Sequence, residues 1–164
     1  MEKELTIRVI TNADSQAVID LILPIQQQEN NVPVTLEDQP DLKRIEAVYQ
    51  GSGGGFWGIE DEGMMVATIA LIDIGDGKGV IRKMFVKQEY RGRTLGLATR
   101  LLEHLIAYCK TAGITDLYLG TVHTLKAAIR FYERNDFTIV AKHELPPAFP
   151  IMEVDDVFCH LHLK

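Results

Sequence analysis

The fold of this chain is decided by one stretch, Val80–Leu105, which reads VIRKMFVKQEYRGRTLGLATRLLEHL. It starts with an apolar run that predicts a strand, passes through a basic turn with two glycines, and ends in an amphipathic helix. The apolar side chains of the helix recur at one-face spacing: Leu97, Ala98, Leu101, Leu102, Leu105, Ile106 and Cys109. This order directs the free N–H groups of a helix N-terminus beyond the strand end, an arrangement that binds phosphate.

Positive charge is concentrated in the same stretch. Between Arg82 and Arg100 there are six basic side chains and one acid, Glu89, although the formal net charge of the chain is −6. A positive patch on an acidic protein favours a small polyanionic ligand over nucleic acid. A solvated basic loop accounts for the charge alone equally well.

Two sequence signatures go further. Arg93-Thr-Leu-Gly96-Leu-Ala98 fits R-x-x-G-x-G/A and is followed by Leu101-Leu102. With the preceding strand and basic turn, it resembles the acetyl-coenzyme A loop of the GNAT acetyltransferase superfamily. Residues 127–137, AAIRFYERNDF, resemble the second signature of that family, with Asn135-Asp136 in place of the usual glycine. The resemblance covers most of the chain.

The resemblance implies acetyl-CoA as co-substrate and the residues that hold it. In that family, the strand before the loop bonds the pantetheine arm, while the loop amides and the helix N-terminus hold the pyrophosphate. Carried over to this chain, cofactor binding falls on Met84, Phe85, Val86, Arg91, Gly92, Arg93, Thr94, Leu95, Gly96, Leu97, Ala98, Thr99 and Tyr132. The loop register stays open between Arg91 and Arg93 as first residue. Leu125 replaces a common cofactor-binding asparagine.

The resemblance also implies chemistry. We expect an N-acetyltransferase in which a primary amine of a small molecule or peptide attacks acetyl-CoA directly in a ternary complex. Tyr132 corresponds to the family's tyrosine near the sulfur and is the expected general acid for the leaving thiolate. Glu60 and His123 are the base candidates, beside water. A side chain at Gly96 is expected to obstruct the ligand and to spare the fold.

The flanking elements predict a mixed α/β fold. Before the central stretch we expect a strand over 5–10, a helix carrying residues 17–25, a short helix ending at 51, and a hairpin of strands 56–60 and 64–73. After it come a strand over 116–122, a helix capped by Thr124, and closing strands over 137–142 and 154–163.

The order of these elements fixes one further expectation. Because a helix joins strand 80–86 to strand 116–122, the two should be parallel neighbours, and separation of their ends would admit a ligand. The sequence thus predicts a GNAT-like, mostly antiparallel sheet of about six or seven strands, with one splayed parallel pair and helices on both faces.

Composition is compatible with this assignment. The 164 residues, 46% hydrophobic and 24% charged, fit one acetyltransferase-like domain over 1–164. The chain has no apolar run of membrane-spanning length and its start lacks a signal-peptide pattern, so we expect a cytoplasmic protein without a membrane partner. Cys109 and Cys159 are expected to be core residues. His160 and His162 should share a strand face, but no third ligand is placed beside them, so no metal is expected.

Two other phosphate-binding motifs do not fit this sequence. Gly53-Gly-Gly55-Phe-Trp-Gly58 satisfies G-x-G-x-x-G, but a helix precedes it and a strand follows, the reverse of a dinucleotide fold, so we interpret it as a flexible connector. A P-loop nucleotidase lacks its Gly-Lys-Ser/Thr. A noncatalytic acyl-CoA-binding sensor remains the alternative. The acidic balance favours a cationic amine acceptor, and edge pairing of the closing strands would give a homodimer.

Overall fold

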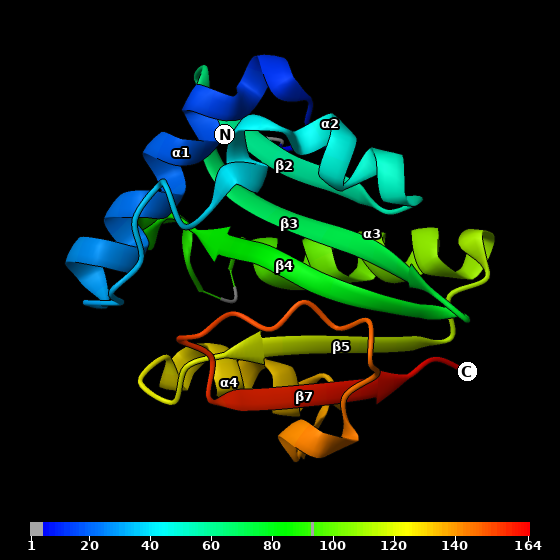
Figure 1. The fold of residues 1–164 in the computed structure, drawn as a ribbon. Coiled ribbons are helices and arrows are strands. Elements are labelled where there is room, and N and C mark those ends of the chain that lie inside the picture. Colours follow the sequence, from blue (N-terminus) through cyan, green and yellow to red (C-terminus); the bar gives the residue numbers. More distant parts are fainter. Residues whose placement is uncertain (1–4, 93) are drawn as a thin grey trace.

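The computed structural model describes residues 5–92 and 94–164, and its centre is a seven-stranded sheet in the order β1-β2-β3-β4-β5-β7-β6 (Figure 1). Its strands are β1 (Ile7–Val9), β2 (Gly55–Asp61), β3 (Met64–Gly75), β4 (Lys78–Val86), β5 (Asp116–Thr121), β6 (Thr138–Val140) and β7 (Val157–His162). Every neighbouring pair is antiparallel except β4 and β5, which are parallel. The mixed α/β architecture with one parallel pair is confirmed.

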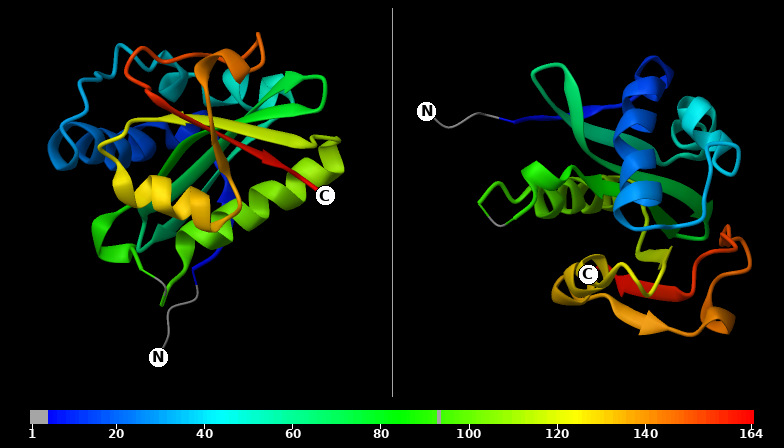
Figure 2. Two further views of the ribbon diagram at one scale, coloured as in Figure 1. Left: turned by 90° about the horizontal axis from the view of Figure 1, so that it is seen from below. Right: turned by 90° about the vertical axis from the view of Figure 1, so that its left-hand side faces the viewer.

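Helices cover both faces of the sheet (Figure 2). They are α1 (Ser15–Leu23), α2 (Ile45–Val48), α3 (Leu97–Ala112) and α4 (Lys126–Arg134), with a π-helical turn η2 (Pro24–Glu29) and shorter 3₁₀ turns. The first two pack in one apolar core with Phe56 and Met65, and the last two pack on the other face around Leu101 and Leu117. Burial of these two faces is the main favourable contribution to folding.

Helix ends follow the sequence in part. α3 ends at Gly113, whose φ of 77° is the left-handed conformation of a helix cap, as the sequence predicts. α1 ends at Pro24. From this proline the chain continues as the π-helical turn η2, in which the hydrogen-bonding pattern differs from that of the α-helix. The expected cap of α4 by Thr124 is wrong, because the cap position belongs to Leu125 and no side chain caps that helix.

The glycine-rich segment before β2 is not a flexible connector, contrary to the sequence interpretation. A Cβ on Gly54 would lie 1.9 Å from the carbonyl oxygen of Leu71, and one on Gly55 would lie 2.7 Å from the ring of Trp57. Gly54 is a glycine because its backbone approaches the backbone of β3 too closely for a side chain, and Gly55 is one because the ring of Trp57 occupies the space. Glycine runs mark close packing here, not mobility.

Histidines on β7 and both cysteines have structural surroundings. Asp116 Oδ1 lies 2.8 Å from His160 Nε2 and 3.1 Å from His162 Nδ1, so the two imidazoles share one face as expected. Within residues 5–92 and 94–164, no three histidine, cysteine, aspartate or glutamate side chains are arranged so that they could hold a metal ion. Cys109 and Cys159 are both buried. No helix in those ranges is long and apolar enough to cross a membrane.

Candidate active site

β4 and β5 meet at one end and separate toward the other (Figure 1). Their register pairs Lys78 with Asp116 and ends with Val80 opposite Tyr118. Beyond that point β4 continues to Val86 without a partner in β5, and β5 continues along β7 instead. Backbone donors and acceptors on the inner edges of the two strands are therefore available to a ligand lying between them.

A bulge redirects β4 as it leaves β5. The β3–β4 register passes from Thr68 opposite Phe85 to Ala70 opposite Arg82, which leaves an extra residue on β4. Lys83 takes up the irregularity with φ at +53°, and Thr68 Oγ1 donates to its carbonyl oxygen at 2.7 Å. A lysine in this conformation costs about 1–3 kcal/mol, and bulges of this kind turn side chains toward sites.

The first cavity at the split lies between β4 and α4. Its volume is about 390 Å³, and its walls include Met84, Phe85 and Val86 from β4 with Phe131 and Tyr132 from α4. Tyr132 is 7% exposed, and its hydroxyl donates to Met84 Sδ at 3.5 Å. Burial raises the pKa of Tyr132, and the nearby Cys159 adds to the shift, so the hydroxyl keeps its proton at neutral pH.

A second cavity of about 500 Å³ adjoins the first at Val86 and Phe131 and reaches the start of α3. Gly96, with φ at +59°, precedes the helix, and its carbonyl oxygen accepts the N–H of Arg100 at 3.0 Å. In the part of the chain that the structure describes, the three amides just ahead of Arg100 donate to no carbonyl group and can bind an anion. They belong to Leu97, Ala98 and Thr99, all in the cavity wall.

Two arginines of the basic turn already have partners. Arg91 forms an ion pair with Glu29 at 2.5 Å, and its Nε donates to Val86 O at 2.8 Å. Arg100 donates to Leu5 O at 2.5 Å. The predicted contact residue Arg93 lies outside the described residues. Of the other predicted contact residues in this turn, Gly92 is exposed with φ at +114°, and Thr94 and Leu95 are exposed as well.

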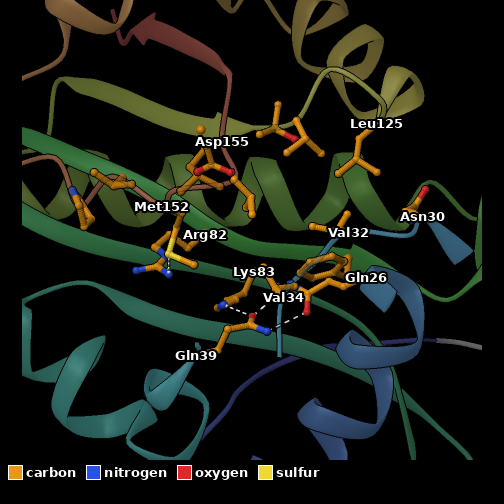
Figure 3. Close-up of a pocket in the computed structure, with 18 of the residues that line it drawn as sticks. Gln26, Asn30, Val32, Val34, Gln39, Arg82, Lys83, Leu125, Met152 and Asp155 are labelled. Carbon is orange, nitrogen blue, oxygen red and sulfur yellow. Dashed lines mark hydrogen bonds between the residues drawn. The ribbon is translucent and has the colours of Figure 1, made fainter. Parts of the chain in front are cut away.

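A third cavity lies on the α1 face of the split, with a volume of about 130 Å³ (Figure 3). It shares three wall residues with the first cavity, Asn30, Phe85 and Leu125, so the two meet. Its charged side chains come from distant parts of the chain: Arg82 and Lys83 from β4, and Asp155 from the loop before β7. None of the three is among the site residues predicted from the sequence.

Lys83 is held by a buried polar network. Its side chain is 5% exposed, and Nζ donates to Gln39 Oε1 at 2.5 Å and lies 3.6 Å from Asp41 Oδ2. Gln39 in turn donates to Gln26 Oε1 at 2.9 Å, and Tyr49 donates to Asp41 at 2.6 Å. Burial lowers the pKa of Lys83 to about 8, against the opposing attraction of Asp41. The network fixes one wall of the third cavity.

Asp155 lies against β5 at a place where β5 has no side chain. A Cβ on Gly120 would lie 2.6 Å from Asp155 Oδ2, so glycine is what lets the carboxylate sit there. Burial raises the pKa of Asp155 to about 6, although Arg82 and Lys83 lower it and Asp156 raises it. A carboxyl group that titrates near neutral pH in a cavity is suited to accept a proton.

The two base candidates from the sequence lie elsewhere. Glu60 pairs with Arg8, and neither Glu60 nor His123 is in the wall of any of the three cavities described above. The side chain of His123 is 72% exposed, and its Nδ1 lies 2.5 Å from Asp156 Oδ2. The sequence did not predict Asp155 as a site residue, because only folding brings the loop before β7 to the cavity between β4 and β5. Its sole sequence signal is an acidic pair after a proline-rich segment.

Comparison with known proteins relates this geometry to a family. The sequence profile of the Acetyltransferase (GNAT) family matches residues 19–137. A crystal structure of an acetyltransferase of the GNAT family from Staphylococcus aureus Mu50 is 35% identical, with a TM-score of 0.94, and covers 98% of this chain and 100% of that chain.

More distant proteins share the same fold. YncA of Salmonella typhimurium, a putative acetyltransferase solved with acetyl-CoA, has a TM-score of 0.70 at 19% identity and covers 99% of this chain and 95% of that chain, a likeness of fold alone. Probable N-acetyltransferase family 8 member 5 of Mus musculus is 25% identical over 108 residues, which are 64% of this chain and 48% of that protein. The chain thus spans about half the length of this curated relative.

Proposed function

The chain belongs to the GNAT acetyltransferase family, and from that premise we propose that it is an N-acetyltransferase that moves the acetyl group of acetyl-CoA to a primary amine. The observation that carries the proposal is the separation of β4 from β5 beyond Val80 and Tyr118, which leaves cavities on both sides of the sheet that meet at the split. A co-substrate can enter from one side and an acceptor from the other.

The cofactor-side cavities suit acetyl-CoA in shape and chemistry. Backbone groups on the β5-facing edge of β4 near Met84–Val86 can bond an amide-containing arm, and the amides of Leu97–Thr99 can bind a pyrophosphate. This is the assignment that the family resemblance gives to these residues, with Gly92 and Gly96 shaping the loop. When bound, acetyl-CoA would supply a thioester whose carbonyl carbon accepts an amine.

Tyr132 is proposed as the proton donor. Its hydroxyl lies 3.5 Å from the sulfur of Met84, in the wall where the cofactor-side cavity meets the split, and its raised pKa keeps it protonated. As the C–N bond forms and the C–S bond breaks, the leaving thiolate takes that proton. The amides of β4 would orient the carbonyl group and disperse its developing negative charge.

Replacement of Tyr132 tests this role. In Tyr132→Phe, acetyl-CoA should still bind with the parent affinity, because the ring and its packing remain, while kcat falls roughly 100-fold through loss of the proton donor. Calorimetric titration gives the affinity, and release of free thiol in the presence of an amine gives kcat. Tyr118→Phe on β5 is the matched control, since that residue is in the wall of none of the three cavities.

Three outcomes are distinguishable. A parent enzyme that releases thiol only with amine present, and a slow Tyr132→Phe, support the proposal. Unchanged turnover in Tyr132→Phe removes that residue from the mechanism and leaves the activity intact. Tight acetyl-CoA binding without transfer to any amine identifies the alternative, a noncatalytic acyl-CoA sensor.

A further inference from the structure

The third cavity, which we call the acceptor cavity, contains opposite charges that are not paired with each other. Within residues 5–92 and 94–164, the Arg82 guanidinium forms one side-chain hydrogen bond, to Met152 Sδ at 3.6 Å, and no ion pair. In the same ranges the carboxylate of Asp155 accepts no hydrogen bond and forms no ion pair. A guanidinium has five N–H donors, so Arg82 has most of its capacity unused.

Lys83 differs from Arg82 and Asp155 because its charge already has partners within the protein. This difference makes the cavity selective for the ligand charges that Arg82 and Asp155 can bind. Its ammonium group is turned toward Gln39 and has Asp41 within ion-pair distance, whereas Asp155 lies on the opposite side of the cavity, beside β5 (Figure 3). The charge of Lys83 is therefore compensated inside the protein. Arg82 and Asp155 are the wall charges left for a ligand.

We propose that the acceptor cavity binds a small aminocarboxylate, with its carboxylate on Arg82 and its amine facing Asp155. The inference rests on the proposed function and names its substrate class. Arg82 can bind a carboxylate through two parallel N–H donors, a geometry that a neutral amide or a polyamine does not match. The negative charge of Asp155 complements the ammonium end of the ligand. Because Gly120 has no side chain, the carboxylate of Asp155 can lie against β5.

The size of the cavity limits the acceptor. A closed apolar cavity of about 150 Å³ holds one benzene molecule, so about 130 Å³ suits roughly six non-hydrogen atoms. Glycine, alanine and β-alanine are of this size. The cavity meets the cofactor-side cavity at Asn30, Phe85 and Leu125, and a thioester would reach a bound amine through this opening.

The proton and bond changes balance with these residues. Asp155 takes one proton from the ammonium group, and the freed lone pair on nitrogen forms the C–N bond as the C–S bond breaks. The sulfur takes the proton of Tyr132, and the second proton lost by nitrogen restores the tyrosine through solvent. Asp155 then releases its proton to water. The products are the N-acetyl aminocarboxylate, free CoA and one proton.

A panel of matched amines tests the substrate class. The probes are glycine, L-alanine and β-alanine, each against its amide, with spermidine as a cationic amine. We expect kcat/KM for each acid to exceed that for its amide by roughly 10- to 100-fold, the usual worth of a hydrogen-bonded charge pair. The amide has the more acidic ammonium group, so reactivity alone would favour it. Equal or better use of the amides, or use of spermidine alone, overturns the proposal.

Substitutions of Arg82 test whether this residue binds the carboxylate end of the ligand. Arg82→Ala should lower kcat/KM for the acids far more than for the amides and so remove the preference for acids, and Arg82→Lys should restore part of it. Arg44→Ala, an exposed arginine outside the cavity, is the control and should keep the full preference. Melting curves confirm folding. A preference that survives Arg82→Ala contradicts the assignment.

The pH profile tests Asp155 separately. With its pKa at about 6, set by burial and by Arg82, Lys83 and Asp156 around it, kcat/KM should fall below pH 6 in the parent. Asp155→Asn should remove that limb and lower kcat about 100-fold. A limb that persists in Asp155→Asn excludes the residue. If no amine is acetylated at all, the proposed function fails; if amines are acetylated without acid preference, this inference alone fails.

Discussion

Asp155 is a residue that the fold accommodates at a cost. Its folded pKa of about 6 lies above the value of about 3.9 for an unfolded aspartate, because burial disfavours the charged form. The folded state therefore binds the proton more tightly than the unfolded state. The stability contributed by this group is present below the unfolded pKa and is lost as the pH rises to about 6. At neutral pH the ionised carboxylate weakens the fold.

Replacement by asparagine should reveal this cost. Asp155→Asn should raise Tm at pH 7.5, by about 2–4 °C for each kcal/mol regained, and the gain should disappear near pH 4, where the parent carboxyl is protonated. Thermal denaturation at both pH values measures the difference. Asp156→Asn is the control, because that neighbour is exposed and its pKa is lowered by hydrogen bonding to His123. A destabilised Asp155→Asn at pH 7.5 would contradict the assignment.

Single residues also mark the limits of prediction from sequence. The central stretch predicted Gly96 at a helix start, and the structure has it there, but its φ of +59° means that any side chain adds strain as well as bulk. Substitution at Gly96 therefore carries a strain cost that the expectation from sequence did not include, and whether the fold tolerates that cost stays a prediction. Arg82, Lys83 and Asp155 could not be found from local patterns, because a bulge and a long loop bring them together.

At the scale of elements, the contact between β2 and β3 depends on glycine. The Cβ of an alanine at Gly54 would overlap the carbonyl group of Leu71, which belongs to the backbone of a central strand and cannot move aside. Helix and strand periodicity predicted most of the elements well. The same reasoning failed on this segment because spacing of glycines does not distinguish a loop from a tightly packed strand.

A matched pair of alanine substitutions tests this account. Gly54→Ala should lower the free energy of unfolding by about 3 kcal/mol or more, within the upper range for steric overpacking. Gly51→Ala, three residues earlier, brings its Cβ only to 3.3 Å from Glu46 O and should change stability far less. Urea denaturation provides both values. Equal effects of the two substitutions would show that the β2–β3 approach is looser than described.

At the scale of the molecule, net charge is a poor guide to the acceptor. The chain carries −6 overall, which by itself favours a cationic amine, yet the acceptor cavity has two basic wall residues and one acid. The field that a ligand meets is set by the nearest buried groups. The predicted homodimer stays a prediction: β6 is an edge strand, and its Ile139 is 56% exposed, so sedimentation is the suitable measurement.

The central claim is that the split between β4 and β5, with the loop before α3, binds acetyl-CoA, and calorimetric titration with CoA tests it most directly. The parent should bind, and Gly96→Glu should lose binding, because a carboxylate would occupy the pyrophosphate position beside the amides of Leu97–Thr99. Gly75→Glu adds the same charge and a comparable left-handed strain in the β3–β4 turn and should bind as the parent does. Parent-like affinity in a folded Gly96→Glu would contradict the claim.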